Sequence, residues 1–135
     1  MTAPDPLVEE ATRRSGLVWV VPDGSAREHP VWHVWHDGRM FVVTGGREQP
    51  LPDGLTSAVV AVRSRARQAD RLVQWRAGVA QVPPGSALWD EVVPLLHAKR
   101  LNAPDGEEQP ARWARESVVL AFTPTGETVP VGQMS

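Results

Sequence analysis

The residues best suited to chemistry follow a strand-like run that ends at Thr44, where the chain reads Thr44-Gly45-Gly46-Arg47. Two glycines at the end of a strand allow the backbone to approach a ligand closely. The arginine adds a planar cation that suits carboxylates and phosphates. The stretch therefore fits a small anion-binding loop, although an ordinary glycine-rich connection has the same composition.

Four histidines raise the question of a metal site. His33 and His36 are expected on opposite faces of one strand, because successive side chains alternate. His29 and His33 share a face, but four residues at ~3.3 Å each separate them by roughly 13 Å, too far for zinc ligands that lie ~2 Å from the metal. His97 is distant in sequence. We therefore expect no metal site and interpret the histidines as buried or partly exposed imidazoles.

Other catalytic patterns are missing from the sequence. No serine stands in a Gly-x-Ser-x-Gly elbow, and no glycine-rich phosphate motif of the nucleotide-binding kinds occurs. The acidic pairs fall at expected helix starts or in loops, where solvation or the helix dipole explains them. The chain has no cysteine and no tyrosine, which excludes thiolate and phenol chemistry. No catalytic residue is identified from these patterns.

The length and charge narrow the class of protein. A chain of 135 residues predicts a single domain, with residues 6–123 as its ordered core and a loose C-terminal tail. A formal net charge of -2 provides no basic field to attract nucleic acid or a membrane surface. No apolar run approaches the ~20 residues of a membrane helix, and no signal peptide opens the sequence. We therefore expect a cytoplasmic protein without nucleic-acid or membrane partners.

The clearest local signal is a hairpin around Asp37-Gly38. This pair favours a type I′ turn, because both central residues need positive φ. It joins predicted strands at 31–36 and 39–44. The second strand carries apolar side chains on both faces over residues 40–43, whereas a strand solvated on one side would alternate. We therefore expect this hairpin inside a barrel wall or at an interface.

The remaining elements follow from turn signals and apolar patterns. The predicted elements are a helix from Pro6 to about Ser15, strands at 17–21, 57–62, 70–81 and 116–122, and a helix through Leu101 capped by Ser86. Pro94 inside this second helix predicts a kink or two short pieces, because proline removes a helical hydrogen bond. The segments 47–56 and 102–110 are expected to be loops.

These elements predict a mainly β protein, a six-stranded antiparallel barrel with two peripheral helices. The helices are too few and too late in the chain for a parallel sheet of βαβ units. Several strands are apolar on both faces. A barrel interior covers one face, and we expect a homodimer interface to cover the rest.

The order of elements and several short motifs resemble the FMN-binding split-barrel proteins, the pyridoxamine 5′-phosphate oxidase-like family. The resemblance is carried by HPVWHVWHDG at 29–38, RMFVVTGG at 39–46, and WRAGVAQV at 75–82 with the helix sequence SALWDEVVPLL after it. It covers most of residues 6–123. It implies a six-stranded split β-barrel and a homodimer, with FMN or the related deazaflavin in grooves at the dimer interface.

The resemblance also implies a set of cofactor-binding residues. Family members commonly hold the cofactor phosphate with a Thr/Ser and Arg/Lys set after the third strand, which points by position to Thr44 and Arg47. The strand before the hairpin would lie near the ring system, with Trp32 or His33 bordering it.

The sequence departs from the family pattern after the third strand. The family's Ser-x-Lys is absent, and the chain reads GGREQPLPDGL with a single basic residue. Arg63 and Arg65 share one face of an extended chain with Arg67. This row is expected either to supply the missing charge to the phosphate or to form a solvated strand face.

The sequence thus supports a first hypothesis of a dimeric flavoprotein, an FMN- or deazaflavin-dependent oxidoreductase acting on an unknown small molecule. The alternative is a split-barrel homodimer that has lost its cofactor site and acts as a binding or structural protein. A third option, a barrel that binds single-stranded nucleic acid, has only the Trp75-Arg76 pair in its favour, and the net charge argues against it.

Overall fold

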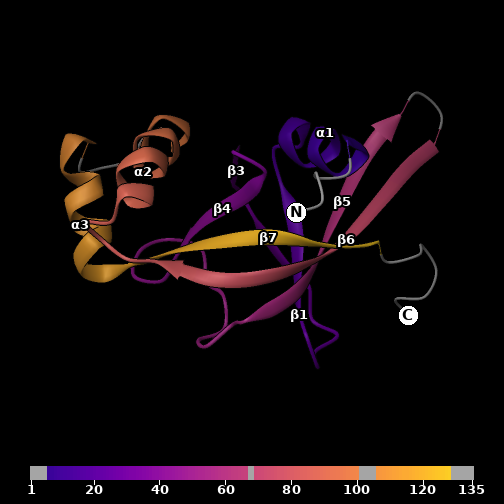
Figure 1. Cartoon of the computed structure of the whole chain (residues 1–135), viewed down its shortest axis with the longest axis horizontal. Coiled ribbons are helices and arrows are strands. Elements are labelled where there is room, and N and C mark those ends of the chain that lie inside the picture. The colour runs from indigo at the N-terminus through magenta and orange to yellow at the C-terminus, as the bar shows by residue number, and fades with distance from the viewer. Residues whose placement is uncertain (1–5, 67–68, 101–105, 129–135) are drawn as a thin grey trace.

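A computed structural model describes residues 6–66, 69–100 and 106–128, with the backbone alone for 64–66, 69–72 and 128. These residues form seven strands, three α-helices and one short 3-10 helix (Figure 1). The elements in chain order are α1 (Pro6–Arg14), β1 (Val18–Pro22), β2 (His29–Val31), β3 (Val34–His36), β4 (Arg39–Thr44), β5 (Ser57–Ala66), β6 (Ala69–Val82), α2 (Ala87–Lys99), η1 (Gly106–Glu108), α3 (Gln109–Glu116) and β7 (Val118–Thr128). No helix in this described part of the chain is long and apolar enough to cross a membrane.

The seven strands form one antiparallel sheet in the order β2-β1-β5-β6-β7-β4-β3. The two edge strands, β2 and β3, are separated along the chain only by Trp32 and His33. The sheet must therefore curl until its edges approach each other, which produces a split barrel. The sequence predicted a single strand over 31–36, and this expectation is wrong. One straight strand cannot pair with β1 at one edge and β4 at the other, so the chain breaks at these two residues and the strand count rises from six to seven.

The hairpin turn between β3 and β4 is confirmed. Asp37 has φ 51° and Gly38 has φ 77°, the two positive values that a type I′ turn needs. β4 begins at Arg39 and ends at Thr44, as predicted. This turn fixes the register in which Val34 faces Phe41.

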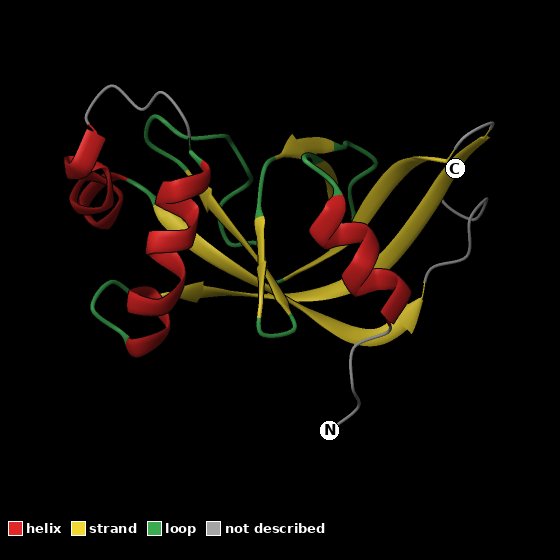
Figure 2. Cartoon of the chain, turned by 90° about the horizontal axis from the view of Figure 1, so that it is seen from above, coloured by secondary structure: helices red, strands yellow, loops and turns green. Residues whose placement is uncertain are grey.

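Two hydrophobic cores lie on opposite faces of β4 and β7. The barrel interior contains Met40 and Val42 with apolar residues of β1, β5, β6 and β7. The outer core contains Phe41 and Val43 with apolar residues of α2 and Trp113 of α3. Figures 1 and 2 show α2 and α3 together at one end of the molecule and α1 at the other. The two-sided apolar pattern of β4 is therefore explained within one protomer, as a strand in a barrel wall that helices cover on the outside. The homodimer stays a prediction.

The predicted N-cap of α2 is confirmed. The Trp89 N–H donates to the Ser86 hydroxyl at 3.1 Å, which satisfies one of the free donors at the helix start. Pro94 lies within the helix without dividing it into two pieces. Pro94 and Asp90, the residue whose carbonyl loses its helical donor, are both exposed, so water can replace the missing hydrogen bond.

Two features of the C-terminal part differ from the prediction. Helix α3 spans residues that the sequence assigned partly to a loop, and β7 continues to Thr128 instead of ending at Phe122. Pro110 lies in the first turn of α3, where proline is tolerated. The buried residues of this helix are Gln109, Arg112 and Trp113. An apolar pattern could not reveal a helix whose inner face is mostly polar.

Candidate functional site

The structure brings two of the predicted cofactor residues, Trp32 and Thr44, together through Gln49. The Trp32 N–H donates to the Gln49 side-chain oxygen at 2.8 Å, and the Gln49 amide donates to the Trp32 and Val43 carbonyls at 2.9 and 3.2 Å. The Thr44 hydroxyl donates to the Gln49 carbonyl at 2.7 Å. Gln49 thus supplies hydrogen bonds to the backbone where the strand breaks between β2 and β3. No periodic pattern points to this role, because Gln49 lies in a loop.

The two glycines after Thr44 have a structural role. A Cβ atom on Gly46 would lie 2.8 Å from the Glu116 carbonyl oxygen, and the residue has φ 62°. The Ser117 hydroxyl donates to the Gly45 carbonyl at 3.0 Å. The close approach that these glycines permit is therefore to the chain at the end of α3. Arg47 follows on the exposed side of this loop.

Glu48, next to Arg47, is buried and forms ion pairs with two arginines. Its carboxylate accepts from Arg100 at 3.1 Å and from Arg112 at 3.2 Å. The Glu48 side chain is 1% exposed and that of Arg112 is 6% exposed. This cluster joins the loop after β4 to α2 and α3. Sequence reasoning missed it, because its three members lie far apart in the chain.

His33 lies away from the outer core and packs beneath α1. Its Nε2 atom is 2.6 Å from the Thr12 carbonyl oxygen, so Nε2 carries the proton and donates it. Burial lowers the pKa of His33 to about 4, the hydrogen bond to Thr12 opposes this shift, and the nearby Lys99 ammonium adds to it. A neutral, fully buried imidazole that holds a helix has the geometry of a structural residue.

Arg63 lies near the outer end of β5. Its guanidinium pairs with Glu28 at 3.1 Å and stacks over the Trp19 ring, 4.9 Å from the centroid. Arg65 belongs to the same strand, and the structure describes its backbone but not its side chain. Arg67 lies outside the described residues.

One protomer does not gather the predicted phosphate-binding residues. Thr44 pairs with Val118 at the start of β7, the end of the sheet that follows α3. Arg63 lies near the C-terminal end of β5, and this end of the strand lies at the opposite end of the molecule from α2 and α3 (Figure 1). The Thr44 hydroxyl proton is already donated to Gln49, so this side chain has no donor left for a phosphate. Within a single protomer these residues do not fit a complete flavin phosphate clamp.

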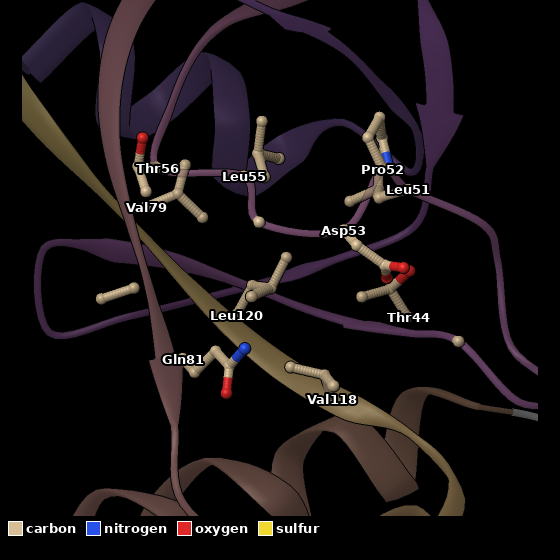
Figure 3. Close-up of a pocket in the computed structure, with 13 residues that line it drawn as sticks. Thr44, Leu51, Pro52, Asp53, Leu55, Thr56, Val79, Gln81, Val118 and Leu120 are labelled. Carbon is tan, nitrogen blue, oxygen red and sulfur yellow. The ribbon is translucent and has the colours of Figure 1, made fainter.

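An open pocket of about 270 Å³ lies on the interior side of Thr44, and we call it the barrel-end pocket. It is formed by the end of β4, the loop 51–56, the end of β6 and the start of β7 (Figure 3). Val79 and Leu120, which belong to the interior core, form its buried floor. Asp53 is the only charged residue among those that line it. The pocket is therefore acidic, in contrast to the basic groove that a phosphate would require.

Comparison with known proteins shows the fold. No protein-family model matches this sequence, and no curated protein matches it. Among solved structures, the heme storage protein HutZ from Vibrio cholerae superposes with a TM-score of 0.62 at 13% identity, over 95% of this chain and 94% of that chain.

Two further structures superpose at similar identity. A FAD-binding protein from Mesorhizobium loti gives a TM-score of 0.59 at 11% identity, over 88% of this chain and 86% of that chain. A candidate pyridoxamine 5′-phosphate oxidase from Corynebacterium glutamicum gives a TM-score of 0.54 at 14% identity, over 95% of this chain and 93% of that chain. The protein therefore has the split β-barrel fold of pyridoxamine 5′-phosphate oxidase-like proteins, which confirms the fold class predicted from the sequence.

Proposed function

We propose that this chain forms a split-barrel homodimer that binds a flavin, either FMN or deazaflavin, and acts as an oxidoreductase on a small molecule. The proposal is supported by the fold, which the chain shares with a protein described as FAD-binding and with a candidate pyridoxamine 5′-phosphate oxidase. A bound flavin supplies the redox chemistry, and the protein supplies its placement and electrostatic environment.

The observation that carries the proposal is the separation of the cations within one protomer. Arg47 is exposed near Thr44 at the α2–α3 end, and among the described residues no ion pair occupies it. Arg63 is half exposed at the opposite end, stacked on Trp19. A two-fold dimer uses the same patch on both copies and can place one end of a protomer beside the other end of its partner. We therefore propose a composite clamp with Arg47 from one copy, and Arg63 and Arg65 from the other. Thr44 supports this clamp indirectly, because its bond to the Gln49 carbonyl holds the loop that carries Arg47.

The ring of the cofactor would lie near Trp32 in this arrangement. The Trp32 side chain is half-buried against the outer core, and its backbone is fixed by Gln49. His33 is placed differently, because it is buried under α1 and bonded to Thr12. We therefore keep Trp32 as the ring-bordering residue and propose for His33 an indirect role, through the position of its neighbour.

The alternative function is a homodimer that binds another ligand and has no flavin. It is favoured by two observations: the Thr44 hydroxyl donates within the protein, and Asp53 is the charged group of the pocket beside it. Both oppose an anion at this position. Heme is included among the ligands to be tested, because HutZ is described as a heme storage protein.

The proposal is tested by titration of the purified protein with FMN, deazaflavin and heme, followed by tryptophan quenching and visible absorbance. We expect saturable flavin binding to a dimer. Arg47→Ala and Arg63→Ala should each weaken it tenfold or more, while the matched pair Arg13→Ala and Arg27→Ala, which removes exposed arginines elsewhere, changes it less than twofold.

A subunit-mixing experiment tests the composite clamp itself. Homodimers of Arg47→Ala and homodimers of Arg63→Ala have only damaged sites. A mixed dimer has one doubly damaged site and one intact site, so mixing should restore tight binding at half of the sites in the heterodimers. No restoration would contradict the shared clamp. A folded dimer that binds no flavin would favour the alternative function, and a monomer by sedimentation would contradict both.

A further inference from the structure

The barrel-end pocket has the shape of a binding site with a closed apolar floor and an open polar rim. Its floor consists of Val79 and Leu120, which are 8% and 5% exposed. Leu51 and Leu55 of the 51–56 loop, both half-buried, form one wall. Figure 3 shows Leu120 between this wall and the side chains of Gln81 and Val118. A buried apolar floor that opens to solvent can accept the apolar body of a small molecule.

The polar rim favours a hydrogen-bond donor. The Thr44 hydroxyl proton is donated to the Gln49 carbonyl at 2.7 Å, so toward the pocket this oxygen can only accept. The Asp53 carboxylate is also an acceptor, and Figure 3 shows it on the same side of the pocket as Thr44. Gln81 can present either end of its amide across the pocket. Two acceptors, one of them charged, thus lie at one side of an apolar cavity.

The size of the pocket excludes large ligands. Its volume of about 270 Å³ is below the ~300–1,000 Å³ of pockets that hold drug-sized molecules. An anionic ligand would meet the Asp53 carboxylate with no lining cation to offset it. A ligand with an ammonium group satisfies both acceptors while its apolar part covers Leu120 and Val79.

We propose that the barrel-end pocket binds a small organic ammonium compound, with its apolar body on Leu120 and its ammonium group between Asp53 and Thr44. This site is separate from the flavin clamp proposed above, because Arg47 and Arg63 do not line it. Thr44 is the one residue in both proposals. The site gives the end of the barrel a binding activity that does not depend on a flavin.

The wild-type protein provides the first test, with three probes of equal shape and different charge. Benzylammonium, benzyl alcohol and benzoate are titrated in turn, and binding is followed by backbone amide shifts in NMR spectra. We expect benzylammonium to bind at least tenfold more tightly than benzoate, with benzyl alcohol between them. The largest shifts should fall in residues 51–56, 79–81 and 118–120. Equal binding of the three probes, no binding, or shifts elsewhere would overturn the proposal.

Variants separate the charge from the cavity. Asp53→Asn should weaken benzylammonium about tenfold and change benzyl alcohol less than twofold. Asp90→Asn, which removes an exposed carboxylate on α2, is the matched control and should leave all three affinities unchanged.

Filling the cavity should remove binding of every probe. Gln81→Trp and Val118→Trp both add bulk at exposed positions on the rim, so a failure of one variant to fold leaves the other as the test. Binding of benzylammonium that survives in a folded filling variant, or that is unaffected by Asp53→Asn, would refute the site. Because Arg47 and Arg63 are intact in all these variants, loss of ammonium binding with retained flavin binding distinguishes this site from the clamp.

Discussion

The two ends of the barrel hold their helices by different chemistry. At the α1 end the buried groups are neutral: the Trp75 indole N–H donates to the Thr12 hydroxyl at 3.0 Å, and His33 donates to the Thr12 carbonyl. At the α2–α3 end they are charged: the Glu48 carboxylate lies between Arg100 and Arg112. Both clusters join a helix to a strand or loop distant in sequence.

The difference shows how buried polar groups can be stabilised in one small fold. A buried neutral group loses its hydrogen bonds to water and needs a hydrogen-bond partner in the protein to replace them. Each contact at the α1 end therefore compensates for the lost hydration of the two groups that form it. A buried carboxylate needs its cations, and removal of one partner leaves a charge in a region of low polarity. Acid and the loss of single hydrogen bonds should therefore lower the stability of the α1 end. The stability of the α2–α3 end should depend on the charges of its buried side chains.

The largest expected effect is the removal of the buried carboxylate. Glu48→Gln leaves the Arg112 guanidinium buried without the Glu48 charge, and should lower the free energy of unfolding by about 3–5 kcal/mol. Urea denaturation measures this, with Glu107→Gln on the exposed surface as the control. Replacing both Glu48 and Arg112 by apolar residues should reduce stability less than Glu48→Gln alone. A double variant that is the less stable of the two would show that the pair is not a buried-charge cluster.

Acid should act on the other end of the barrel. Because burial lowers the pKa of His33 to about 4, the unfolded chain binds a proton at His33 before the folded protein does. The stability from neutral His33 is complete above pH 6.5 and is lost as pH falls from 6.5 to about 4. At ~1.36 kcal/mol per pH unit this loss is about 3 kcal/mol.

The acid effect is measured as the free energy of unfolding across that range, in wild type and His33→Gln. The variant should have a flatter profile than wild type, and His29→Gln should keep the wild-type slope. Parallel profiles in wild type and His33→Gln would assign the acid sensitivity to other groups.

The smallest expected effect is the loss of one neutral hydrogen bond. Thr12→Val keeps the shape of the side chain and removes the acceptor of the Trp75 indole, so the cost is that of one unsatisfied buried donor, about 1–2 kcal/mol. Thermal or urea unfolding measures it, together with tryptophan emission. If Thr12→Val lowers the free energy of unfolding as much as Glu48→Gln does, the proposed difference between the two ends is wrong.

Local structure was predictable wherever backbone chemistry acts over a few residues. Asp37-Gly38 determined the hairpin, because few other pairs adopt positive φ twice. Ser86 determined the start of α2 through its bond to the Trp89 N–H. The two-sided apolar pattern of β4 correctly predicted a strand buried on both faces, although the helices that cover its outer face could not be read from that pattern.

The candidate site was much less predictable. Trp32 and Thr44 do meet, but through Gln49, which no local pattern singled out. Arg47 and Arg63 were both candidates for the cofactor phosphate, but the end of β4 and the C-terminal end of β5 lie at opposite ends of the molecule (Figure 1). Asp53 appeared as an ordinary turn residue until the loop that carries it was found beside Val79 and Leu120.

The sequence alone thus determined the fold class, the turns and most of the strands, because these depend on side-chain periodicity and on the conformations of single residues. Tertiary structure decided where β2 ends and β3 begins, since the chain must leave one edge of the sheet and join the other at Trp32 and His33. It also decided which face of α3 is buried, because Arg112 of this helix donates to Glu48, a residue 64 positions earlier in the chain.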